Sequence, residues 1–167
     1  CHIPPGQCVS APFCAHDMIR TAYEVSAGAS TAEPFGILTV PQAGLFAIAS
    51  PYGPHGRAAA RLALSVLEQA GSWEISRKPR QWTRAALEAV RRRWSARIDE
   101  NSALSTSFVS VDVTVFTVTG IVGGRLGDAH AYQIRRPLLV RETKGPTERF
   151  SLSAFKSGKI EVANWSA

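Results

Sequence analysis

The stretch Ala43–Leu64, AGLFAIASPYGPHGRAAARLAL, is the most informative part of the sequence for the fold. It begins with a short β-compatible run, Gly44–Ala49, and passes through the Gly- and Pro-rich turn SPYGPHG. An Ala- and Leu-rich run follows, with apolar residues three and four apart, which is the spacing of a helix that ends near Gly71. The stretch therefore predicts a strand, a glycine turn and a helix in succession.

The segments before and after this stretch extend the same pattern. Upstream, Tyr23–Ser30 and Pro34–Val40 are further β-compatible runs divided by turn residues. Downstream, helical spacing returns over Gln81–Asp99, after the helix breaker Pro79. Three strands followed by two helices are expected.

The sequence period changes to two from Thr106 onward, which predicts two or three strands. Turns are expected at Gly120, at Gly123-Gly124 and at Gly127-Asp128. Two later segments, Pro137–Glu142 and Arg149–Trp165, are expected to form further strands or irregular edge segments.

Strands, paired helices and strands again predict an α+β domain, an antiparallel β-sandwich flanked by helices. The chain has 167 residues, of which 45% are hydrophobic, enough for one sizeable core. We expect residues 1–17 to be an irregular extension and residues 18–167 a single domain. No apolar run is long enough to cross a membrane, and the first residues lack an export signal, so a cytoplasmic location is expected.

The net charge of +6 favours anionic partners, and much of it lies in Arg77–Arg97. Trp82 and Trp94 are interleaved with these arginines, as on some nucleic-acid-binding surfaces. The interpretation that we prefer is a core stripe, because apolar residues recur at helical spacing with the arginines outward: Leu87, Val90, Trp94 and Ile98.

A cluster of thiol and imidazole groups near the start makes Cys8, Cys14 and His16 a candidate zinc site. The spacing matches no standard zinc finger, and a coincidental cluster is the preferred interpretation.

Two blocks of the sequence resemble the PPM (2C-type) metal-dependent serine/threonine phosphatases. The stretch AGLFAIASPYGPHGRAAARLAL resembles a family block at Gly44-Leu45-Phe46, Gly53 and His55. The stretch IVGGRLGDAHAYQIR resembles the later Gly-Asp block, at Gly127 and Asp128. The resemblance covers residues 20–136 and implies a shortened, minimal form of the PPM fold.

In active members of that family, clustered aspartates hold two Mg or Mn ions whose bridging water attacks phosphate. Here the family's acidic turn keeps only Glu33, followed by Pro34, and its Asp-Gly pair is replaced by Ser50-Pro51. The later aspartates have no counterparts, since Asp128 is the last aspartate of the chain. The remnants of the family site are Glu33, Ser50, His55, Gly127 and Asp128.

These departures lead us to expect no catalytic residues and no cofactor, with Mg or Mn as the alternative. His55, Arg57 and Arg125 are candidates for a cationic pocket that binds a phosphorylated ligand. The expected function is that of an inactive, PPM-like regulatory protein that binds a protein partner, such as a phosphoprotein or a kinase-pathway signalling component. Because a shortened sandwich leaves sheet edges to cover, a dimer is a further expectation.

Two other functions remain open. The first is a divergent Mn- or Mg-dependent phosphatase, which would use Glu33, Asp128 and late glutamates. The second is a basic nucleic-acid-binding module that acts through Arg77–Arg97.

Overall fold

The computed structural model describes residues 36–70, 75, 77–128, 132–135, 138–142, 152–158 and 160–165. Five strands form one antiparallel sheet in the order β1-β2-β3-β4-β7. Their bounds are β1 Gly36–Val40, β2 Leu45–Tyr52, β3 Phe108–Thr117, β4 Gly120–Leu126 and β7 Glu161–Trp165. The predicted run Tyr23–Ser30 lies outside the described residues.

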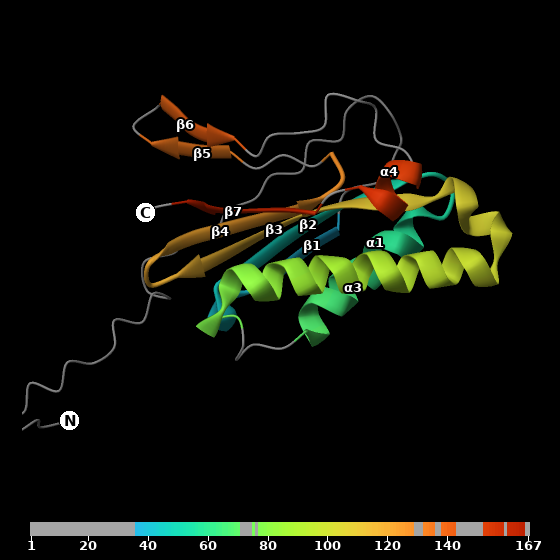
Figure 1. Ribbon diagram of the computed structural model, residues 1–167, viewed down its shortest axis with the longest axis horizontal. Helices are drawn as coiled ribbons and strands as arrows, with labels where there is room; N and C mark the ends of the chain where they lie inside the picture. Colours follow the sequence, from blue (N-terminus) through green and yellow to red (C-terminus); the bar gives the residue numbers. More distant parts are fainter. Residues whose placement is uncertain are drawn as a thin grey trace, which may run out of the picture.

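The two long helices and a small second sheet lie on opposite sides of the five-stranded sheet (Figure 1). Helices α1 (Gly56–Gln69) and α3 (Pro79–Glu100) pack against one face. On the other side lies the antiparallel pair β5 (Tyr132–Arg135) and β6 (Leu138–Glu142). Two 3₁₀ turns, η2 (Pro41–Ala43) and η3 (Ser102–Thr106), precede β2 and β3. The predicted α+β class, with an antiparallel sheet flanked by helices, is confirmed.

The core lies between the sheet and the two helices. Alternate residues of β3 supply its centre, with no solvent-exposed surface: Val109, Val111, Val113 and Val115. Helix α1 contributes a stripe of small and branched side chains: Ala59, Ala60, Ala63, Val66 and Leu67. Small residues at this spacing let α1 lie close to the sheet.

Helix α3 contains the predicted core stripe. Leu87, Val90, Trp94 and Ile98 are all buried, and Trp82 is only 5% exposed. The indole Nε1 of Trp94 donates a hydrogen bond to the carbonyl of Ser107 (2.8 Å). The indoles are therefore core groups that join α3 to its neighbours, while Arg84 and Arg92 are exposed.

The predicted turn at Gly123-Gly124 is wrong, because both glycines lie inside β4 and pair with residues of β3 and β7. A Cβ on Gly124 would lie 2.3 Å from Cγ2 of Thr83 on α3. The glycine allows close approach of the helix rather than a change of chain direction. The bend at Gly127-Asp128 is confirmed, and the β3–β4 turn consists of Val118 and Thr119, immediately before Gly120.

The last segment differs from the expected strands and edge segments in one respect. A short helix, α4 (Leu152–Ser157), precedes β7 and buries Phe155 completely. Strand β7 then pairs with β4 and extends the sheet beyond it. No helix within the described parts of the chain is both long and apolar enough to span a membrane.

Candidate functional site

The candidate site lies where β2 ends, α1 begins and β4 ends. After Tyr52 the chain turns at Gly53, whose φ of 77° is in the left-handed region. A Cβ at Gly53 would lie 2.1 Å from the carbonyl oxygen of Thr106, so the turn requires glycine. The backbone N–H of His55 donates to Oγ of the buried Ser107 (2.9 Å). These contacts hold the glycine turn against the start of β3.

Tyr52 and Asp128 form the central contact of the site. The Tyr52 hydroxyl lies 2.9 Å from each carboxylate oxygen of Asp128 and donates a hydrogen bond to the carboxylate. The Tyr52 ring stacks on Phe108, with ring centroids 5.0 Å apart. Burial raises the pKa of Tyr52 to about 12, and the bond to Asp128 and its charge act in the same direction. The phenol is therefore held protonated as a donor.

Ser50 and Pro51, which the sequence resemblance aligns with an Asp-Gly pair, lie on β2 immediately before Tyr52. Ser50 pairs with Ser110 of β3, and Pro51 packs against the first residue of α1. A Cβ on Gly56 would lie 2.9 Å from Cβ of Pro51. Ser50 and Pro51 thus offer a neutral hydroxyl and a backbone carbonyl, with the ring of Pro51 used in packing.

A second polar group lies further along the same strands. Asp112 on β3 is opposite Arg125 on β4 and is 8% exposed. The Arg125 guanidinium forms an ion pair with Glu161 on β7 (2.8 Å). Oδ2 of Asp112 accepts no hydrogen bond from the described residues. Burial raises the pKa of Asp112 to about 7, although the charge of Arg125 opposes the shift.

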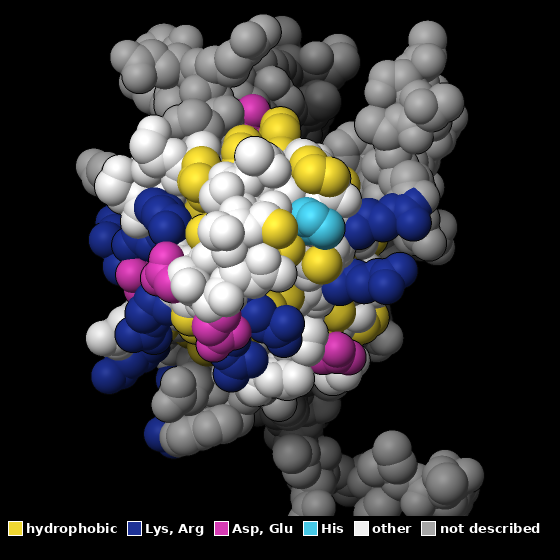
Figure 2. Space-filling view, turned by 90° about the vertical axis from the view of Figure 1, so that its right-hand side faces the viewer, with side chains coloured by type: hydrophobic (Ala, Val, Ile, Leu, Met, Phe, Trp, Pro, Cys, Tyr) yellow, Lys and Arg dark blue, Asp and Glu magenta, His cyan; other side chains and the backbone are white. Residues whose placement is uncertain are grey.

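The structure separates the three residues proposed for a cationic pocket. His55 and Arg57 are exposed at the start of α1, whereas the side chain of Arg125 is 3% exposed and engaged by Glu161. One end of the molecule shows a surface histidine among hydrophobic side chains, with Lys and Arg side chains on both sides (Figure 2). His55 and Arg57 therefore remain the exposed members of the candidate pocket.

Of the other candidate residues, Ser50, Gly127 and Asp128 come to the same end of the sheet. Glu33 and the candidate zinc ligands Cys8, Cys14 and His16 lie outside the described residues.

Sequence reasoning missed two residues of this region, Tyr52 and Asp112. Asp112 carried a signal, because it is a charged residue in the middle of the alternating strand FVSVDVTVF, at a position flanked by valines. Tyr52 carried no such signal in the sequence, because its partner Asp128 lies 76 residues away. Only the pairing of β2, β3 and β4 brings the two together.

No protein-family model matches the sequence, and comparison with curated proteins finds no match. Solved structures do match. The serine/threonine phosphatase PstP/Ppp of Mycobacterium tuberculosis has a TM-score of 0.73 at 16% identity, over 86% of this chain and 72% of PstP. The chain has the PPM-type phosphatase fold.

Two further structures with this fold match over smaller shares. The PstP catalytic domain in complex with two manganese ions has a TM-score of 0.61 at 19% identity, over 70% of this chain and 51% of that one. PppA, a key regulatory component of T6SS in Pseudomonas aeruginosa, has a TM-score of 0.67 at 15% identity, over 79% and 64%.

The manganese complex corrects the expectation that no cofactor is involved. A phosphatase catalytic domain of this fold holds two manganese ions, so the comparison points to metal use rather than to its absence. The described residues nevertheless do not fit a two-metal centre. They contain no cluster of three or more His, Cys, Asp or Glu side chains that could hold a metal ion. Hard divalent ions require several oxygen ligands, usually carboxylates.

Proposed function

We propose that the protein is a regulatory binding module with the PPM-type phosphatase fold and does not itself hydrolyse phosphate esters. Its binding partner is another protein, and phosphorylated proteins are one class of such partners. The proposal excludes turnover but not metal binding, because the PstP catalytic domain, which has this fold, holds two manganese ions.

The observation that carries the proposal is the bond between Tyr52 and Asp128. Two-metal hydrolysis requires carboxylates that are ionised and available to ions on both sides of the attacking water. Here the Asp128 oxygens accept from a phenol whose raised pKa keeps its proton in place. The two positions before Tyr52 on β2 are Ser50 and Pro51 rather than acidic residues. A tyrosine–carboxylate bond stabilises this end of the sheet where an active enzyme needs ligands.

The shape of this end of the sheet supports a role in binding. Positive φ angles at Gly53 and Gly127 set the turn after β2 and the bend after β4. His55 and Arg57 are exposed beside that turn. Cations at such a position attract phosphorylated or acidic groups through charge-assisted hydrogen bonds.

The test is hydrolysis of a generic aryl phosphate with Mn²⁺ or Mg²⁺ present, for the wild type and for Asp128→Asn. We expect the same background rate for both proteins at every metal concentration. Metal-dependent turnover that Asp128→Asn abolishes would favour the divergent phosphatase instead. Binding of the ions is measured in parallel by calorimetry, so that occupancy and turnover are read separately.

A further inference from the structure

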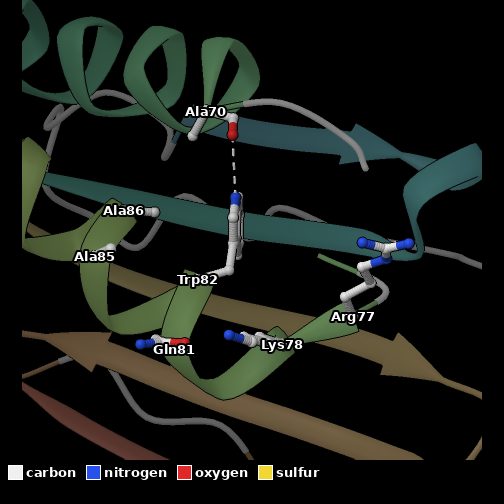
Figure 3. A pocket seen from close by; sticks show the side chains of 7 residues that line it. All are labelled: Ala70, Arg77, Lys78, Gln81, Trp82, Ala85 and Ala86. Atoms are coloured by element: carbon white, nitrogen blue, oxygen red, sulfur yellow. Dashed lines mark hydrogen bonds between the residues drawn. The ribbon is translucent and has the colours of Figure 1, made fainter. Parts of the chain in front are cut away.

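Three hollows along the outer surface of α3 have one exposed lining residue in common, Gln81. The first, of about 540 Å³, lies between the end of α1 and the start of α3 (Figure 3). The second, of about 630 Å³, lies between α3 and the β3–β4 hairpin. The third, of about 590 Å³, lies between α3 and the segment that follows α4. Gln81 lines all three, and we call these three hollows together the α3 groove.

The α3 groove is strongly basic. Its cationic lining residues are Arg77, Lys78, Arg80, Arg84 and Arg91. Glu88 is the one acid among the described lining residues, and it forms an ion pair with Arg91. Arg91 is held further by donating to the carbonyl of Gly158 (2.7 Å). The acid is thus neutralised within the groove, and the exposed side chains of Lys78, Arg80 and Arg84 set its charge.

Among the described residues, the apolar floor of the first hollow consists of small groups rather than exposed aromatic faces. Ala70, Ala85 and Ala86 line the first hollow. Trp82 also lines it, but its ring is 5% exposed and its Nε1 donates to the carbonyl of Ala70 (3.1 Å), as Figure 3 shows. Single-stranded nucleic acids bind largely by stacking bases on exposed aromatic rings. No such ring lines the described part of the groove.

We propose that the α3 groove binds an acidic peptide segment of a partner protein. Carboxylates of the peptide would face Lys78, Arg80 and Arg84, and small apolar side chains between them would contact the alanine floor. The proposal rests on the proposed function and deepens it, because it names the surface and the chemistry of the partner.

The test is fluorescence anisotropy with a labelled peptide of repeated Glu-Glu-Leu units. The groove variant is Lys78→Glu/Arg84→Glu. The matched control, Arg61→Glu/Arg92→Glu, makes the same charge change at exposed positions outside the groove. Because the groove variant places two carboxylates opposite the carboxylates of the peptide, we expect it to weaken binding roughly tenfold or more, and the control by less than about threefold. Circular dichroism melts establish that both variants fold.

Other results would overturn the proposal. Equal weakening by both variants would show that the net charge of the protein alone determines binding. If the wild type does not bind the peptide, the groove is not a peptide-binding site. Tighter binding of a thymidine oligonucleotide, lost in the groove variant, would assign the groove to nucleic acid. The proposed function and the binding groove are contradicted by different results. Asp128-dependent hydrolysis would contradict the proposed function, whereas unchanged peptide binding by the groove variant would contradict only the groove as the binding site.

Discussion

The hydroxyl of Tyr52 lies 2.9 Å from both carboxylate oxygens of Asp128, although two strand connections and 76 residues separate them in sequence. The contact joins the end of β2 to the bend after β4, across the first residue of β3. It places a hydrogen-bond donor on the Asp128 carboxylate at this end of the sheet.

Replacing Tyr52 with Phe should lower the free energy of unfolding by about 1 kcal/mol, because a half-buried carboxylate loses its donor while the ring keeps its stack on Phe108. Urea denaturation measures the change. Tyr52→Leu, which also loses the stack, should cost more than Tyr52→Phe. Equal stability of Tyr52→Phe and wild type would mean that the bond contributes nothing.

The pKa of Tyr52 gives an independent measure of the same bond. Asp128→Asn should lower the pKa from about 12, yet leave it above 10.0, because burial is the larger cause of the shift. Alkaline titration of phenolate absorbance measures it, with Tyr52→Phe subtracted to remove the other two tyrosines. A pKa unchanged in Asp128→Asn would show that the carboxylate does not act on the phenol.

Asp112 should make stability depend on pH. Its folded pKa of about 7 lies above the ordinary value of 3.8, so the folded state binds more protons than the unfolded state between these two values. The free energy of unfolding should therefore fall as the pH rises through this range. Asp112→Asn should match wild type near pH 4 and exceed it near pH 8, by at most about 4 kcal/mol. Urea denaturation at both pH values gives the difference.

The control for that prediction is Arg125. Its charge lowers the pKa of Asp112, so Arg125→Met should steepen the loss of stability with pH rather than flatten it. If Asp112→Asn shows the same pH dependence as wild type, the carboxyl is not buried in solution.

Gly124→Ala should destabilise the protein by about 1 to 3 kcal/mol, because the new methyl would lie 2.3 Å from Cγ2 of Thr83. The matched variant is Thr83→Ser/Gly124→Ala, which removes the clashing methyl. It keeps the hydroxyl that donates to the carbonyl of Pro79 (2.8 Å). Thermal denaturation should show recovery in the double variant relative to Gly124→Ala. Without recovery, the contact between α3 and β4 is not the cause.

The residues that could be assigned from sequence are those with a local signal. The helical spacing of Leu87, Val90, Trp94 and Ile98 predicted both α3 and its buried face, because core contacts select that period. Gly123-Gly124 misled, since a glycine needed for close packing looks the same in sequence as one needed for a turn. Helix α4 was missed because six residues are too few to show a helical period.

The residues of the candidate site also divide into those with a local sequence signal and those without one. Ser50, Gly127 and Asp128 could be selected from local motifs around the turn and the bend. Tyr52 as the partner of Asp128, and Arg125 as the partner of Glu161, depend on strand order and register, which no single segment encodes. Sequence also suggested that Arg125 would join His55 at the surface, whereas the pairing of β3 with β4 buries it opposite Asp112.

Whether the protein lacks phosphatase activity is tested most directly by Mn²⁺-dependent hydrolysis of an aryl phosphate, measured for wild type, Asp128→Asn and Tyr52→Phe. We expect all three proteins to give the same background rate, whatever amount of metal calorimetry finds bound. Turnover by the wild type that rises with Mn²⁺ and disappears in Asp128→Asn would contradict it.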